Sequence, residues 1–117
     1  MKRNAEEVAE GLLALLKQWP DLVKAKLARE MDPGLEAPAV AVMLTIVETG
    51  ELNAFRTAAR PVQRMAATLT IDFMAKLMGP LAHVTWDVPE TVQGPALARH
   101  VIAAEIRRAH PRLATRH

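Results

Sequence analysis

The 117-residue chain contains no cysteine and no serine, and these absences exclude several kinds of chemistry. Without cysteine the chain has no disulfide, no thiolate nucleophile and no Cys-ligated zinc. Without serine it has no serine nucleophile of the G-x-S-x-G type. The four histidines, at positions 83, 100, 110 and 117, show neither H-E-x-x-H nor H-x-H spacing, and the five glycines form no phosphate-binding loop. We therefore expect no metal site and no cofactor.

Long apolar runs and aromatic residues are also scarce. The longest apolar run is about nine residues, far short of the ~20 that span a bilayer. Residues 1–10 contain a basic pair followed at once by acids, without the apolar region of a signal peptide. We therefore expect a soluble, cytoplasmic protein without a membrane span. Aromatic residues make up 3% of the chain, so aliphatic side chains and six methionines must fill the core.

The composition is otherwise that of a soluble globular domain, with 50% hydrophobic and 24% charged residues. The net charge is +2, and most of the basic excess lies towards the C-terminus, at Arg99, Arg107, Arg108, Arg112 and Arg116. A basic segment attracts phosphates or nucleic acid, but it is more often a solvated surface. We do not expect nucleic acid as a partner.

Residues 1–31 are predicted to form two helices. Over residues 4–19 the apolar side chains recur at helical spacing on one face. Asn4 is a suitable N-cap, and Glu7 occupies the capping-box position three residues later. A shorter helix is predicted over residues 21–31.

Residues 38–59 are predicted to form the central helix of the fold. Between residues 39 and 47 only Thr45 is polar, which is the pattern of a helix covered on all sides. Glu48 follows at the end of this run. A carboxylate there either reaches water from the helix end or works as an acid or base on a buried element.

Beyond Pro61 the hydrophobic period changes from 3.6 to 2. Apolar and polar residues alternate over residues 68–73 and again over 83–88, which predicts two strands with one buried face each. Residues 97–108 fit either a strand or a helix. Two strands need a third for stability, so we favour a strand there.

The predicted fold class is α+β, in a single domain over residues 1–117. An apolar helix beside alternating strands is expected to be covered by their sheet, so the antiparallel strands of residues 64–117 should wrap around the central helix. Three strands cover such a helix poorly. We therefore expect a homodimer or higher homo-oligomer that pairs the sheets across a two-fold axis.

Several segments resemble one known family. Ile71-Asp72-Phe73-Met74, with Lys76 and Gly79, is similar to the strand motif I-E-Y-L-K-K-A-R-G. Residues 43–50 are similar to the helix segment N-L-A-E-L-A, residues 101–109 to the last strand V-x-A-E-I-R-D-A, and residues 13–30 to the leading helices. The chain thus resembles the uncharacterised thioesterase-like branch of the hotdog-fold superfamily, although the first two strands of that fold have no counterpart here.

This resemblance implies a protein that hydrolyses or binds an acyl thioester, with coenzyme A as part of the substrate. Glu48 would be the catalytic base or nucleophile, Asn53 would orient a carbonyl or water, and Lys76 would contact a coenzyme A phosphate. The acyl chain would lie beside the central helix, among Met43, Val47 and Met74. Each of these residues also has a purely structural interpretation, as a core or solvated side chain.

Two other functions stay open. The first is a non-catalytic acyl- or lipid-binding protein, or a purely structural dimer, because the His-Gly-Gly start of the helix that supplies backbone amides in the family is absent. The second is an all-helical regulator whose basic helix over residues 97–113 binds nucleic acid.

Overall fold

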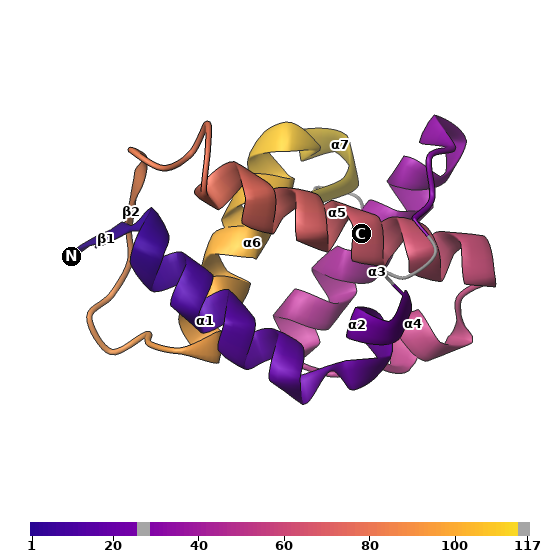
Figure 1. Ribbon diagram of the computed structural model, residues 1–117, viewed down its shortest axis with the longest axis horizontal. Helices are drawn as coiled ribbons and strands as arrows, with labels where there is room; N and C mark the ends of the chain where they lie inside the picture. Colours follow the sequence, from indigo (N-terminus) through magenta and orange to yellow (C-terminus); the bar gives the residue numbers. More distant parts are fainter. Residues whose placement is uncertain (26–28, 115–117) are drawn as a thin grey trace.

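The computed structural model describes residues 1–25 and 29–114, and most of these residues are helical (Figure 1). The elements in chain order are β1 (Lys2–Asn4), α1 (Ala5–Gln18), α2 (Pro20–Ala25), the 3-10 helix η1 (Pro33–Leu35), α3 (Glu36–Thr49), α4 (Asn53–Thr57), α5 (Arg60–Leu77), β2 (Thr85–Asp87), α6 (Pro95–Ala109) and α7 (Pro111–Ala114).

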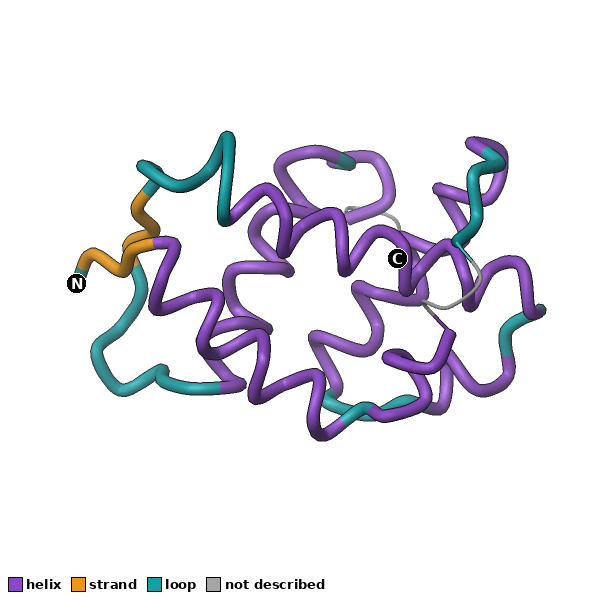
Figure 2. The backbone as a smooth tube through the Cα atoms, viewed as in Figure 1, coloured by secondary structure: helices purple, strands orange, loops and turns teal. Residues whose placement is uncertain are grey.

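The predicted hotdog-like α+β fold is wrong. Within the described residues the only sheet has two strands, β1 and β2, which pair antiparallel with Arg3 opposite Trp86 (Figure 2). This short ladder lies at one end of the molecule and wraps no helix. The strand predicted over residues 83–88 is therefore confirmed only over Thr85–Asp87, and its partner is the N-terminal segment rather than another strand of residues 64–117.

The strand predicted over residues 68–73 is instead the middle of α5. The buried side chains of this 18-residue helix include Met65, Ala66 and Thr70, which recur at helical spacing. The hydroxyl of Thr70 donates to the Ala66 carbonyl at 2.9 Å, so this polar group is satisfied inside the helix. The six alternating residues were too few to identify the element, because the helix continues for about two turns before them and about one turn after them.

Residues 97–108 are helical as well, so the favoured strand interpretation is wrong and the alternative is confirmed. Leu97, Ala98, Val101 and Ile102 are all buried, as expected for one face of a helix. A strand would have placed Ile102 and Ala104 on the same face, but Ala104 is exposed. Both strand motifs of the hotdog resemblance therefore lie mainly in helices.

The N-terminal helix forms as predicted. Asn4 Oδ1 accepts a hydrogen bond from the Glu7 amide at 2.9 Å, and the Glu7 carboxylate accepts one from the Asn4 amide at 3.4 Å, which completes the capping box. The second predicted helix is confirmed only over Pro20–Ala25. Residues 26–28 lie outside the described residues, and residues 29–31 are not helical.

The central helix is shorter than predicted and is covered by helices. It ends at Thr49, because Gly50 adopts a left-handed conformation with φ of 75°, and Asn53 begins the separate helix α4. Its buried side chains pack against α5 and α6, whereas Ala41, Thr45 and Glu48 are exposed. The predicted continuous helix over 38–59, covered on all sides, is therefore wrong.

The most extensive helix–helix interface among the described residues joins α1 to α6, which lie side by side in the fold (Figure 1). Gly11 of α1 faces the backbone at the start of α6. A Cβ atom at position 11 would lie 2.4 Å from the Gly94 carbonyl oxygen, a distance that no real Cβ contact shows. Glycine at this position therefore sets how closely the two helices approach.

We predict that Gly11→Ala destabilises the protein, because the backbone must move to admit the methyl group, at a cost of about 1–3 kcal/mol for an overpacked interior. The better helix propensity of alanine offsets ~1 kcal/mol of this cost, so the expected net loss is up to about 2 kcal/mol. Urea unfolding measures the change. Gly79→Ala is the matched control, since its Cβ would meet nothing closer than the Ala75 carbonyl oxygen at 3.5 Å. An unchanged midpoint in Gly11→Ala would contradict the close contact.

The ion pair between Arg3 and Glu7 should make the stability of the fold depend on pH. The Arg3 guanidinium, which is buried, donates to the Glu7 carboxylate at 2.8 Å and to the Val92 carbonyl at 3.0 Å. The hydrogen bond from Arg3, and then that from the Asn4 amide, hold the pKa of Glu7 below its usual value. A carboxyl with a lowered folded pKa stabilises the fold above its unfolded pKa, and this contribution is lost as the pH falls through the folded pKa.

Glu7→Gln should therefore lower the free energy of unfolding more at about pH 7 than at a pH below the folded pKa of Glu7, where the carboxyl is protonated and neutral like glutamine. Urea unfolding at the two pH values measures this difference. Glu10→Gln is the control, because Glu10 lies on the same helix and is exposed. An equal effect of Glu7→Gln at both pH values would show that its charge contributes nothing to stability.

Candidate ligand pocket

A pocket of about 620 Å³ lies where α3, α5 and α6 meet. This volume is within the range typical of small-molecule sites. Its apolar lining comes from all three helices and from the turn after α5, and includes Val40, Met43, Leu69, Phe73, Leu81, Ile102 and Ile106. We call this cavity the apolar pocket.

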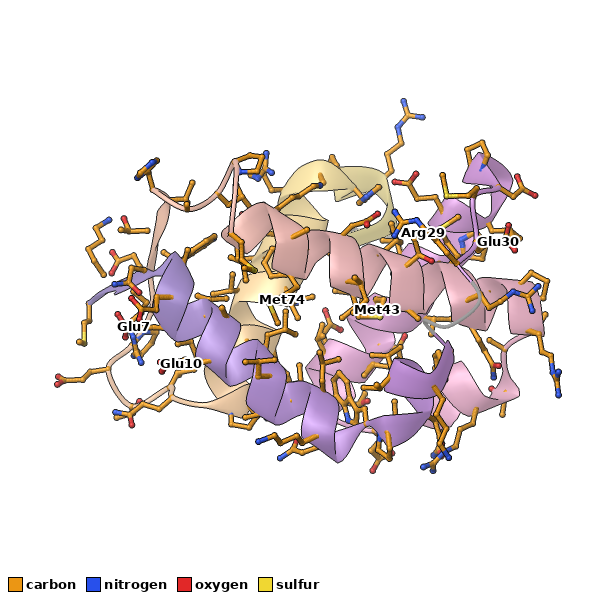
Figure 3. The ribbon with its side chains drawn as sticks, in the orientation of Figure 1. Glu7, Glu10, Arg29, Glu30, Met43 and Met74 are labelled. Atoms are coloured by element: carbon orange, nitrogen blue, oxygen red, sulfur yellow. The ribbon has the colours of Figure 1, made fainter. Side chains whose placement is uncertain are left out.

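The floor of the apolar pocket is held by contacts between α3 and α5. Thr70 and Met43 are both buried, and the Thr70 hydroxyl lies 3.5 Å from the Met43 sulfur, in addition to its bond within α5. Figure 3 shows Met43 in the interior of the bundle. Because the hydroxyl is already satisfied, this end of the pocket offers a ligand an apolar, polarisable surface.

Charged side chains line the rim of the apolar pocket. Asp72 is paired with Arg29 at 2.8 Å, and Glu105 accepts from Arg108 at 2.9 Å and from the Trp86 indole at 3.3 Å. The hydrogen bond with Glu105 raises the pKa of Arg108. Both rim carboxylates are therefore already engaged within the chain.

Two further basic residues, His110 and Lys76, also line the apolar pocket. His110 lies 3.7 Å from Glu36, a contact that is ionic only when the imidazole is protonated. Lys76 is exposed, and its ammonium has no ion pair or hydrogen bond within residues 1–25 and 29–114. The charged group at the rim that is free to contact a ligand is thus the positive Lys76 ammonium.

The structure brings together only part of the predicted site. Met43 and Lys76 both line the apolar pocket, as a substrate contact and a head-group contact would. Val47 is buried in the core, and Met74 is partly buried against it, but neither lines the pocket. Figure 3 shows Met74 on α5.

The two predicted catalytic residues lie elsewhere. Glu48 is exposed and pairs with Arg107 at 2.5 Å. Asn53 is exposed at the start of α4 and borders a separate polar depression beside Gly50. Neither residue lines the apolar pocket, so Glu48, Asn53 and Lys76 do not form one constellation.

The side chains that α6 contributes to the apolar pocket were not predicted from the sequence. Ile102, Ile106 and Ala109 line the apolar pocket because they share one face of α6, and Arg108 also lines it. The strand interpretation also placed Ile102 and Ile106 on one face, but together with Ala104, which is exposed. The helical alternative groups them instead with Glu105 and Ala109, which line the pocket.

The arginines of α6 are directed at groups within the chain. Arg107 pairs with Glu48 and Arg108 with Glu105. The Arg99 guanidinium lies against Gly50, because a Cβ at that position would be 2.5 Å from its nitrogen. This places a cation at the C-terminal end of α3, where the helix dipole favours positive charge. Three of the five C-terminal arginines counted in the sequence are therefore directed at groups within the chain.

Comparison with models of protein families, with curated proteins and with solved structures gives no match for this chain. Within residues 1–25 and 29–114, no cluster of three or more His, Asp or Glu side chains could hold a metal ion. In the same part of the chain, no helix combines the length and apolar character needed to cross a membrane.

Proposed function

We propose that this protein binds a small molecule with an apolar chain and an anionic head group, without converting it chemically. The observation that carries this proposal is the apolar pocket itself, with about 620 Å³ of volume and a lysine free at its rim. Apolar walls with a few polar groups at the edge are the common arrangement in small-molecule sites.

The head group is expected to be anionic because of the charges at the rim. Asp72 and Glu105 are already paired with cations, whereas Lys76 has no partner within the described residues. A carboxylate beside Lys76 would gain a charge-assisted contact while its chain lies against Met43 and Phe73. A fatty acid fits this description, and an acyl thioester of coenzyme A would present its phosphates in the same way.

Binding is favoured over hydrolysis because of where the acidic residues lie. A general base must lie within hydrogen-bond reach of the water or group that it activates. Glu48, the proposed base, is tied to Arg107 outside the apolar pocket. The carboxylates at the rim are bonded to arginines, which hold them in place.

Isothermal titration with dodecanoate and with dodecan-1-ol tests the proposal. The wild type should bind both ligands saturably, with dodecanoate the tighter. Lys76→Gln should lower the affinity for dodecanoate roughly two- to fivefold, which corresponds to the loss of one exposed charge pair, and should have little effect on the affinity for the alcohol. Lys17→Gln, an exposed lysine on α1, is the matched control. Absence of saturable binding of either ligand would refute the proposal.

Blocking the apolar pocket gives an independent test of its position. Ala75 is exposed yet lines the pocket, so Ala75→Trp should obstruct the pocket without disturbing the core. This substitution should lower the affinity for both ligands by on the order of tenfold or more. Ala104→Trp is the control, because Ala104 is exposed on α6 outside the pocket. Equal affinities for the two variants would place the ligand elsewhere.

The same preparations also distinguish binding from catalysis. Dodecanoyl-coenzyme A should be bound but not hydrolysed, in the wild type and in Glu48→Gln alike. Turnover by the wild type that is lost in Glu48→Gln would replace the binding proposal with a thioesterase activity. Circular dichroism of the variant checks that the loss is not caused by unfolding.

A further inference from the structure

A second pocket, of about 470 Å³, lies at the other end of α5, between α2, α4 and the start of α5. Its lining includes Lys24, Arg56, Arg60 and Arg64, and Asp21 is the only acid among the described residues that line it. We call it the basic pocket. Arg60 and Lys76 are sixteen residues apart on α5, so these two cations lie about 24 Å apart along the helix axis.

The charges of the basic pocket are only partly balanced within the chain. Arg56 pairs with Asp21 at 3.1 Å, and Arg64 pairs with Glu30 at 3.7 Å. Lys24 and Arg60 have no ion pair or hydrogen bond of their side chains within residues 1–25 and 29–114. Cations held this close repel each other, and an anion among them would relieve that repulsion.

The start of α5 adds to the positive potential. Its first turn contains no acidic residue, and no side chain caps its N-terminus. The first residue is Arg60, although the helix dipole favours negative groups at this end. A cation at the positive end of this 18-residue helix is electrostatically unfavourable for the fold. Residues that oppose local structural preferences in this way concentrate at functional sites.

The walls of the basic pocket are held in place by contacts between α4 and α5. The side-chain amide of Gln63 donates to the Phe55 carbonyl at 2.8 Å and to the Arg56 carbonyl at 3.4 Å. Phe55 is buried and also lines the pocket. The backbone that carries Arg56 is thus fixed relative to Arg60 and Arg64, which prepares the pocket for an anion.

We propose that the basic pocket binds a phosphate-bearing small molecule. Guanidinium groups match phosphate oxygens in planar, bidentate geometry, and three arginines surround this one cavity. A small ligand is favoured over nucleic acid because the cations gather in a concave pocket instead of forming a stripe, and because the arginines of α6 are directed at acids or at a helix end of the same chain.

Titration with inorganic pyrophosphate at constant ionic strength tests this inference. The wild type should bind one pyrophosphate saturably, and its melting temperature should rise with ligand concentration. Arg60→Gln should weaken binding on the order of tenfold, as for the loss of one charge-assisted hydrogen bond. Lys24→Gln should act in the same direction. Arg107→Gln removes the same charge outside the pocket and should leave the affinity unchanged.

Several results would overturn the inference. Absence of saturable pyrophosphate binding would do so, as would equal weakening by Arg60→Gln and Arg107→Gln, which would indicate a nonspecific charge effect. Arg60-dependent binding of a 20-nucleotide single strand or of phosphatidylglycerol vesicles, without binding of pyrophosphate, would assign the surface to a polymer or a membrane instead. Unchanged circular dichroism and unchanged dodecanoate affinity in Arg60→Gln exclude unfolding as the cause of weaker binding.

Discussion

The contact between Gly11 and the Gly94 carbonyl is the constraint on which the rest of the fold depends. It lets α1 and α6 approach more closely than any side chain would allow, and this pair forms the most extensive helix–helix interface among the described residues. Since α6 also packs on α3, the position of α1 fixes the wall from which Ile102 and Ile106 line the apolar pocket. A larger separation of α1 and α6 at Gly11 would also move the residues of α6 that line the pocket, because packed interiors resist compression.

The elements that could be predicted from the sequence are those defined by local chemistry. The capping box of Asn4 and Glu7 fixed the start of α1, because the donors that it satisfies are only three residues away. Residues 68–73 could not be assigned from their own pattern. A strand and a buried helix can share six alternating residues, and the packing of α3 and α1 against this segment decides which one forms. The sheet-wrapped fold failed for this reason, since every expected strand partner depended on that assignment.

The candidate site, too, could be predicted only in part from the sequence. Met43 and Lys76 were named through the resemblance to hotdog proteins, and both line the apolar pocket although that fold is wrong. The contributions of α6 required knowledge of its helical face. The ion pair of Glu48 with Arg107 joins residues far apart in the chain, so no local pattern could have revealed that this carboxylate already has a partner. The basic pocket was missed because Lys24, Arg56 and Arg60 come from three different helices.

The turn at Gly50 limits which residues position 50 can accept. Its φ of 75° disfavours every residue with a Cβ, and the Arg99 guanidinium occupies the space that a Cβ would need. These two requirements are independent, since one is set by the backbone and the other by a side chain of α6. Asparagine, which tolerates left-handed geometry better than most residues, would still displace Arg99 from the end of α3. Position 50 therefore has a narrower range of acceptable substitutions than its partly exposed location alone implies.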